Sequence, residues 1–573
     1  MSPKLQAIFS RHGGVQRIVI RALSAGFVAQ AAPGADGPLG IWLFFRGLGL
    51  TFLFAFLSLW PQVLGLIGAR GVLPVTPFFR AVSKQVGWER VLLLPSFFWI
   101  GSGDNALHLV CGLGIVFSIL LLLGVLDVIA IVGAWLCYLS FVSAGRDFMG
   151  FQWDSLLLET ALWSLPLALF RPSLRLRLNP VVRVGRWLLF WLLLRFMFAA
   201  GWAKLASGDP SWRDLTALDY HFFTQPLPSP VGYYAHQLPS VIKRLLTFSM
   251  FVIELVVPFA VFFPRSRRWA ALLLIGLQAG IALTGNYGFF NLLSAVLAIP
   301  LLPDAWIRRL LPRFLLNKLQ PDPPASDPPI SDPSISDPPI FEAPRSDAQA
   351  VNSSAGAGDA LAGIAGDAAN VAARSESALT RTDVAVAALR GILCSALFFL
   401  SLVQVLLMFL PEERLPGWAL QGLEYSSAVH AANRYGLFAV MTKERPEIVV
   451  EGSLDGVNWV PYRFKYKPVD VDQRPRFNAP HQPRLDWQMW FAALRPHRRG
   501  GWFDGLCIRL LQGSPDVLWL LAEDPFQGRK PKQVRATLYQ YEFTTLHDRR
   551  QTGAYYKRRD PQPYLDPVSL PGK

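Results

Sequence analysis

Long apolar blocks separated by short polar segments recur along the first two thirds of the chain. A membrane-spanning helix needs roughly 20 apolar residues, because each residue advances about 1.5 Å through a hydrocarbon core about 30 Å thick. The blocks that approach this length are residues 41–66, 106–125, 127–144, 150–170, 187–206, 245–263, 268–285, 288–303 and 391–410. The shorter run 91–100 is expected to be interfacial or re-entrant. The pattern predicts a polytopic α-helical membrane domain with about nine transmembrane helices.

After residue 411 the pattern becomes that of an ordinary globular sequence. The segment PEIVVEGSLDGVNWVPYRFKY contains two β-prone runs joined by a Leu-Asp-Gly turn, which is typical of a hairpin. The segments DVLWLLAED and QVRATLYQYEFTT predict further strands, and no segment of helical period is comparably strong. This part is therefore predicted to be an all-β, sandwich-like domain.

Basic residues gather at alternate ends of the apolar blocks, near 11–21, 171–186, 265–268 and 308–318. The positive-inside rule assigns these segments to the cytoplasm and leaves 67–105, 145–149, 207–244, 286–287 and everything after 411 on the other side. The predicted order is a cytoplasmic N-terminal segment (1–40), a membrane helical domain (41–318), a disordered Pro/Asp/Ala-rich linker (319–385), a last transmembrane helix (386–411) and an extracytoplasmic domain (412–573).

Composition supports a membrane protein and argues against several other classes. Of the 573 residues, 52% are hydrophobic and 17% are charged, whereas soluble proteins carry about 25% charged residues. The net charge of +15 partly reflects topology, and no nucleic-acid-binding motif is visible, so no nucleic-acid partner is expected. The four cysteines form neither a CxxC pair nor a metal-site spacing, so no metal or other cofactor is predicted.

Polar residues within the apolar blocks are the candidate functional residues, because a charge at the bilayer centre costs about 2.5–3.5 kcal/mol on insertion scales. Arg195 lies in the middle of a predicted helix, and Glu159 and Glu254 are its candidate partners. The alternative is that such residues only fix helix packing, with tryptophans as interfacial anchors and Lys204 reaching the interface. The polar outer-face cluster that we expect contains Arg146, Gln152, Trp153, Asp154, Arg195, Lys204, Asp209, Trp212, Asn286, Tyr287 and Asn291.

Several long segments closely resemble signature segments of the lipase maturation factor family. In the membrane part these are GRDFMGFQWDSLLLE, KLASGDPSWRDLTALDYHFFTQPLPSP and LTGNYGFFNLL. In the C-terminal part they are RYGLFAVMTKERPEIVVEGSLDGVNWVPYRFKYKP, APHQPRLDWQMWFAALRP and FTTLHDRRQTGAYYKRRDPQPYLDPVSL. The resemblance covers nearly the whole chain apart from the N-terminal segment and the linker, which departs from the family pattern.

The resemblance implies a membrane-resident folding and assembly factor for secreted lipases or other secretory clients, and not a metabolic enzyme. It implies the endoplasmic reticulum membrane as the location, or the inner membrane in a bacterium, with client contact by the C-terminal domain on the lumenal or periplasmic side. Trp487, Trp490 and Trp502 are the client-binding candidates, and the alternative is that Trp487 and Trp490 fill the domain core.

A more local resemblance leads to a second hypothesis. AAGWAKLASGDPSW is similar to a stretch of the vitamin K-dependent gamma-carboxylases, in which a lysine acts as base on a reduced quinone. That hypothesis implies a membrane enzyme with Lys204 as base and Glu159 as a second candidate catalytic residue. It covers one helix end, and Ala203 stands where a second lysine is expected. A transporter, the third class, is disfavoured because no internal repeat is detectable.

Overall fold

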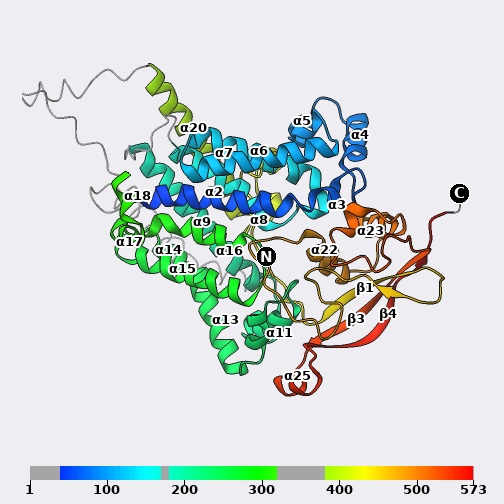
Figure 1. Ribbon diagram of the computed structural model, residues 1–573. Coiled ribbons are helices and arrows are strands. Elements are labelled where there is room, and N and C mark those ends of the chain that lie inside the picture. The colour runs from blue at the N-terminus through cyan, green and yellow to red at the C-terminus, as the bar shows by residue number, and fades with distance from the viewer. Residues whose placement is uncertain (1–38, 169–179, 319–380, 572–573) are drawn as a thin grey trace, which may run out of the picture. The chain divides into compact units, whose positions relative to one another are not determined.

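The computed structural model describes residues 39–168, 180–318 and 381–571 (Figure 1). Described residues up to 318 and from 394 onward belong to one compact unit, and residues 381–393 belong to a second. Nearly all of the predicted N-terminal segment and linker lie outside the described residues, as do the arginines between 171 and 177. The first unit contains a helical region, followed in sequence by a C-terminal region with a small antiparallel sheet.

Four of the described helices are long and apolar enough to cross a membrane. They coincide with predicted blocks, which confirms a helical region of the transmembrane type. They are α2 (Leu39–Leu59), α6 (Asp104–Leu123), α7 (Asp127–Gly145, continued by the 3-10 turn η2, Arg146–Phe148) and α9 (Pro180–Ala206).

The other predicted blocks are also helical, but most are short or interrupted, so helix length does not confirm nine spans. Pro166, Pro258 and Pro300 lie at the interruptions, because proline lacks the N–H group that continues a helix. These helices are α8 (Gln152–Ser164) with η3 (Leu165–Leu167), α13 (Ser240–Leu255) with α14 (Val257–Ala260), α15 (Pro264–Thr284), α16 (Phe290–Ala298) with η4 (Ile299–Leu301), and α20 (Arg381–Leu406).

Short helices connect these elements. The predicted interfacial run 91–100 forms α5 and η1, and its Ile100 side chain is 90% exposed. The connecting helices are α3 (Val63–Ile67), α4 (Val75–Gln85), α5 (Arg90–Leu93), η1 (Phe97–Trp99), α10 (Pro210–Arg213), α11 (Ala217–Thr224), α12 (Pro230–His236), α17 (Asp304–Leu310) and α18 (Arg313–Lys318).

Helices α2, α6 and α7 pack against one another through small residues and one ion pair. Gly49 of α2 lies so close to α6 that a Cβ atom there would be 2.7 Å from the backbone nitrogen of Leu122. Arg46, buried within α2, pairs with Asp127 at the start of α7 at 2.7 Å. Gly124 ends α6 with a φ of +81°, and a Cβ there would meet the Arg46 guanidinium. The turn between α6 and α7 therefore requires glycine both for its conformation and for space.

Helix α9 is the most enclosed of the four long helices. Within its most apolar 18-residue window, 72% is buried by the rest of the protein, compared with 33% for α6. The elements packed against α9 include α8, η3, α13, α14 and α16. Trp191 of α9 also donates a hydrogen bond to Ser401 of α20 at 2.8 Å. The short helices thus cover a helix that is itself long enough to span.

The C-terminal region contains one four-stranded antiparallel sheet in the order β2-β1-β3-β4. Its strands are β1 (Arg445–Ser453), β2 (Val460–Pro461), β3 (Gln533–Phe543) and β4 (Tyr556–Val568). The predicted hairpin is confirmed, because Glu451 of β1 pairs with Pro461 of β2 across the turn that contains Gly456. β3 corresponds to the predicted strand QVRATLYQYEFTT.

The prediction of an all-β domain missed the helices of this region. α22 (Arg484–Ala493) packs against β1 and α23 (Trp502–Leu511) against β3. The described residues contain no second sheet, so a sandwich is not confirmed. The predicted strand DVLWLLAED was wrong: its start lies in α24, which begins with a proline at a favourable helical position. The helices are η5 (Glu412–Arg414), α21 (Gly417–Ala428), α22 (Arg484–Ala493), α23 (Trp502–Leu511), α24 (Pro515–Leu518) and α25 (Leu546–Thr552).

The contact between α2 and α6 gives a prediction about stability. We expect Gly49→Val to lower the free energy of unfolding by about 1–3 kcal/mol, because the added side chain must push against the backbone of α6. Thermal unfolding of the detergent-solubilised protein, followed by tryptophan fluorescence, measures the effect. Gly276→Ala in α15 is the control, since a Cβ there meets nothing within 4 Å. Equal melting temperatures for Gly49→Val and wild type would contradict the packing described here.

Candidate functional site

The C-terminal region is joined to the membrane helices by a bidentate ion pair buried on both sides. Asp154 lies in the first turn of α8, and Arg484 is the first residue of α22. The two guanidinium nitrogens of Arg484 lie 2.8 and 3.0 Å from the two carboxylate oxygens of Asp154. Tyr138 of α7 donates to the same carboxylate at 2.5 Å. The side chains of Asp154 and Arg484 are 0% and 1% exposed, so the pair is shielded from water.

Local structure explains why both charges are tolerated in this place. The N-terminus of α8 carries a partial positive charge that favours the carboxylate of Asp154. Arg484 also donates to the carbonyl oxygen of Phe148 at 2.7 Å, and its guanidinium lies 5.8 Å from the Phe151 ring centroid. Burial alone lowers the pKa of Arg484, but the adjacent carboxylate outweighs that effect and raises its pKa above the ordinary value. Arg484 therefore stays charged, as the pairing requires.

A second buried network confirms that Glu159 is the partner of Arg195. Arg195 of α9 pairs with one carboxylate oxygen of Glu159 in α8. Arg195 also donates to the backbone carbonyl of Asn433 at 2.6 Å. The other Glu159 oxygen accepts from the side chains of Asn433 and Tyr435 at 2.8 and 2.5 Å. Residues of the C-terminal region thus complete the shell around a charge pair between two membrane helices.

Asn286 forms a third contact between the two regions. Its side-chain nitrogen donates to the carbonyl oxygens of Leu227 and Arg476 at 3.1 and 2.8 Å. Its side-chain oxygen accepts from the backbone N–H of Asn478 at 3.0 Å. The neighbouring Tyr287 is also buried and hydrogen-bonds with Gln225.

Asp209 and Trp212 form a fourth contact, just after the C-terminal end of α9. Asp209 is the residue before α10 and accepts from the backbone of Ser211 at 2.9 Å, which satisfies the start of that helix. Its other oxygen accepts from the backbone N–H of Met441 at 2.6 Å. Trp212 donates to the carbonyl oxygen of Phe438 at 3.0 Å.

Lys204 pairs with Glu254 and takes no part in the hydrogen bonds of Asp209. Its ammonium group lies 2.7 and 2.9 Å from the two oxygens of Glu254, and 3.3 Å from the carbonyl oxygen of Ala200. All three ammonium hydrogens therefore have acceptors. A lysine held in this way is a structural cation, so the geometry does not favour its proposed role as a catalytic base.

The remaining predicted cluster residues are distributed over other contacts. Arg146 lies over the ring of Phe78, and Gln152 accepts from the backbone N–H of Gly436 at 3.2 Å. Trp153 is fully buried and lies 4.8 Å from Trp487 between ring centroids. Asn291 of α16 donates to Gln278 of α15 at 2.9 Å. The eleven residues thus belong to several separate networks, most of which include a C-terminal residue.

The three client-binding candidates are buried to different degrees. Trp487 and Trp490 of α22 are 2% and 6% exposed, and Trp490 donates to the carbonyl oxygen of Thr224 at 2.8 Å. Trp502 is partly buried and contacts the ring of Phe148. Trp487 and Trp490 therefore contribute to the contact between the two regions in the arrangement described.

Two further contacts were not predicted. Arg445, at the start of β1, donates to the carbonyl oxygens of Phe223, Gln225 and Pro226 and pairs with Glu447 at 2.7 Å. Ser58, near the end of α2, and Gln62, the residue before α3, bond with residues 482 and 484. Nothing in the local sequence predicts either contact, because an arginine in a strand and a glutamine at a helix end are both common.

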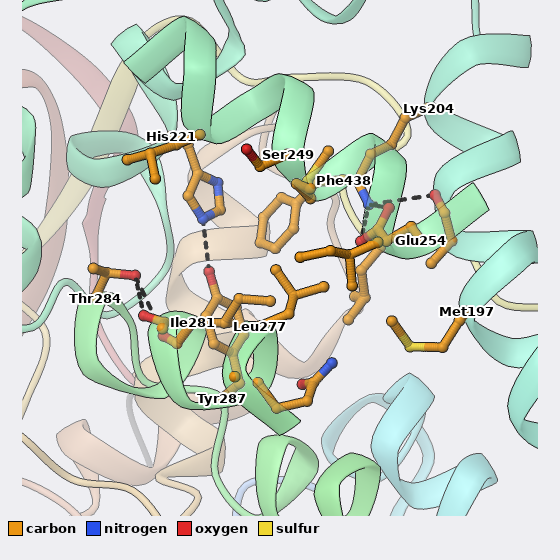
Figure 2. A pocket seen from close by; sticks show the side chains of 18 of the residues that line it. Met197, Lys204, His221, Ser249, Glu254, Leu277, Ile281, Thr284, Tyr287 and Phe438 are labelled. Atoms are coloured by element: carbon orange, nitrogen blue, oxygen red, sulfur yellow. Dashed lines mark hydrogen bonds and ion pairs between the residues drawn. The ribbon is translucent and has the colours of Figure 1, made fainter. Parts of the chain in front are cut away.

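A mainly apolar cavity of about 480 Å³ lies between α9, α11, α13 and α15, next to Phe438. In Figure 2 the Lys204–Glu254 pair and the His221–Tyr287 hydrogen bond both border it. The part of the chain that the structure describes contains no group of three or more His, Cys, Asp or Glu side chains arranged to hold a metal ion.

The fold and these contacts define a membrane protein whose C-terminal region is fixed to its helices by buried charges. Residues 39–309 match the model of the lipase maturation factor transmembrane domain, and residues 431–566 match that of the lipase maturation factor C-terminal domain. The chain belongs to the lipase maturation factor family, which confirms the resemblance seen in its sequence.

The relatives match along most of their length. The chain is 34% identical to lipase maturation factor 2 of Homo sapiens, over 92% of this chain and 82% of that protein. It is 30% identical to lipase maturation factor 1 of Mus musculus, over 92% of this chain and 86% of that protein. No solved structure matches the chain. None of these findings supports the carboxylase alternative.

The Asp154–Arg484 pair gives a prediction about coupling between the two regions. We expect Arg484→Met to lower the free energy of unfolding by about 3–5 kcal/mol, because it leaves a buried carboxylate without its cation. The double variant Asp154→Leu with Arg484→Met should lose less than the sum of the single changes. Arg559→Met is the control, since its pair with Glu542 is exposed and should contribute less than about 1 kcal/mol. Additive effects of the two single changes, in a double-mutant cycle by thermal unfolding, would argue against the pair.

His481, a partly buried histidine at the contact between the two regions, predicts a loss of stability in acid. Burial, with the charges of Lys465 and Arg484, lowers the pKa of His481 to about 4 from an ordinary value of 6.5. The unfolded chain therefore binds a proton below pH 6.5 that the folded chain does not bind until about pH 4, so stability falls as the pH drops through this window. We expect a loss on the order of 1 to 2 kcal/mol at pH 5 from this residue. Melting temperatures of wild type and His481→Gln between pH 7.5 and 5 measure it, and equal pH slopes would contradict it.

Proposed function

We propose that this protein is a membrane-resident folding and assembly factor for secreted lipases or related secretory proteins. Support comes from the family match, which extends through both domain models, and from the names of the relatives. The observation that carries the proposal is the buried ion-pair contact between Asp154 and Arg484. This contact holds the C-terminal region in a fixed orientation on the membrane helices and so suits it to present a surface to a client at the membrane.

We propose the nine-span topology for the membrane part, with the C-terminal region on the non-cytoplasmic side. The burial of α9 supports it: if α9 spans the bilayer, the short helices that cover it lie at membrane depth too. The loops assigned to the outer side contain Asp147, Tyr233 and Asn286, which all bond with C-terminal residues. In a eukaryotic cell this places the client-facing side in the lumen of the endoplasmic reticulum, and in a bacterium in the periplasm.

We propose that Phe491 belongs to the client-contact surface. It follows Trp490 in α22 and is 38% exposed, although its neighbours Trp487 and Trp490 are buried. Its ring lies 6.0 Å from that of Phe151 in the membrane region, measured between centroids. An aromatic side chain that is supported by a rigid cluster but open on one side suits the recognition of apolar surface on an unassembled protein.

The test is secretion of active lipase from cells that lack their own lipase maturation factor and co-express this protein with a lipase. We expect wild type to raise lipase activity per amount of secreted lipase. Phe491→Ser should reduce that gain several-fold at equal membrane abundance, because it removes an apolar contact without changing the core. Phe477→Ser is the matched control, since Phe477 is also exposed, at 50%, and is expected to retain full activity.

Two results would contradict the proposal in different ways. If wild type leaves lipase activity unchanged although it reaches the membrane in full length, the assignment as a lipase maturation factor fails for that client. If wild type acts but Phe491→Ser and Phe477→Ser both retain its activity, the client surface lies elsewhere on the C-terminal region.

A further inference from the structure

The cavity between α9, α11, α13 and α15 opens onto the apolar outer surface of the helical region. Leu246 of α13 and Leu272 and Leu273 of α15 line the cavity, and their side chains are also 43–47% exposed. The same two helices carry further exposed apolar residues, Leu245, Phe248 and Leu283 among them. In the nine-span topology proposed above, α13 and α15 lie within the bilayer, so this surface faces lipid chains. A bilayer component can therefore reach the cavity from the side.

Two glycines of α15 line the cavity and make it wider at that helix. A Cβ atom added at Gly276 or Gly280 would meet nothing within 4 Å, although both residues lie inside a helix and line the cavity. Glycine in the interior of a helix costs about 1 kcal/mol relative to alanine. Its use at two positions one turn apart keeps space for an apolar body against α15.

The charged groups of the cavity leave no net charge for a ligand to neutralise. Lys204 and Glu254 satisfy each other, and the third ammonium hydrogen bonds with a backbone carbonyl. His221 adds no positive charge, because burial and the nearby Lys204 lower its pKa to about 4. An anionic head group, such as a fatty-acid carboxylate, would therefore find no free cation. A neutral ligand is favoured.

The uncharged polar groups of the wall include both acceptors and a donor. Ser249 and Thr284 give their single hydroxyl hydrogens to carbonyl oxygens of their own helices, at 2.8 and 2.9 Å, so they offer only acceptor capacity to the cavity. Gln278 is 4% exposed, and its side-chain oxygen accepts from Asn291 at 2.9 Å. The amide nitrogen of Gln278 then remains a donor toward the cavity.

The hydrogen bonds around His221 identify one further acceptor, which is buried beside the cavity. The side-chain nitrogen of Gln225 donates to two carbonyl oxygens, so its oxygen must accept the single hydroxyl hydrogen of Tyr287. His221 Nε2, 3.1 Å from the Tyr287 oxygen, must therefore be the donor in that contact (Figure 2). In the neutral imidazole Nδ1 is then an acceptor, and it has no hydrogen-bond partner among the described residues.

We propose that this cavity binds one neutral lipid alcohol taken laterally from the bilayer. Its apolar body lies between α13 and α15 against Gly276 and Gly280. Its hydroxyl group accepts from Gln278 and donates to an acceptor of the wall, because a hydroxyl is the small neutral group that does both. Sterols and diacylglycerols share this chemistry. The site is distinct from the client surface proposed above, and the inference does not depend on it.

The test is photolabelling of the full-length protein in lipid nanodiscs with two probes, a photoactivatable sterol and a photoactivatable diacylglycerol. At least one probe should label residues of α13 or α15, located by mass spectrometry. Gly276→Leu should reduce that labelling at least five-fold, because its side chain occupies the open space of the cavity. Gly391→Leu is the matched control, a helical glycine that also meets nothing within 4 Å but does not line the cavity. It should label as wild type does.

A second comparison tests the hydroxyl group itself. The unlabelled lipid alcohol should compete with the probe about tenfold better than its methyl ether, which cannot donate a hydrogen bond. Labelling by the sterol alone, by the diacylglycerol alone or by both supports the proposal and identifies the source. Labelling by neither probe, labelling unchanged in Gly276→Leu, or equal competition by alcohol and methyl ether would overturn it. These readouts need no lipase client, so they are independent of the maturation assay.

Discussion

The buried bidentate pair between Asp154 and Arg484 is the contact on which the arrangement of this protein depends. A carboxylate with no exposed surface is tolerable only when an opposite charge and hydrogen-bond donors surround it. Tyr138 supplies one donor from the membrane helices, but the cation comes from the C-terminal region. The two regions are therefore parts of one folded unit, and the C-terminal region is not a freely tethered domain.

The same principle recurs at Glu159 and Arg195. These two residues neutralise each other within the helical region, yet the remaining acceptor capacity of the carboxylate is filled by Asn433 and Tyr435. Docking of the C-terminal region thus completes hydrogen bonding that the helices leave incomplete. An enclosing shell of this kind favours rigidity over turnover, which agrees with a role in presenting a surface to other proteins.

Sequence reasoning succeeded where a requirement was local and failed where the partner was distant. The helical character of the apolar blocks and the need of Arg195 for an acidic partner, Glu159 or Glu254, follow from the cost of a charge or an open backbone in lipid. The pairing of Asp154 with Arg484 could not be predicted, because Arg484 lies in a segment with no visible reason to face the membrane helices. α22 was missed for a related reason: Arg484, Asp486 and Gln488 are buried, so they interrupt the apolar stripe by which a helix is recognised. Trp487 and Trp490 are buried because α22 packs against the membrane helices. The sequence alone therefore could not show whether these tryptophans lie in the core or on the surface.

The separation of Asp154 from Arg484 along the chain has a consequence for synthesis. The two residues are 330 positions apart, and ribosomes add about 5–20 residues per second. The carboxylate therefore exists for roughly 15 to 65 seconds before its cation has been made. During that interval Asp154 must stay hydrated at the membrane surface or be bound by another protein. A factor that assists the assembly of other proteins thus has a stage in its own biogenesis at which its membrane helices are incomplete.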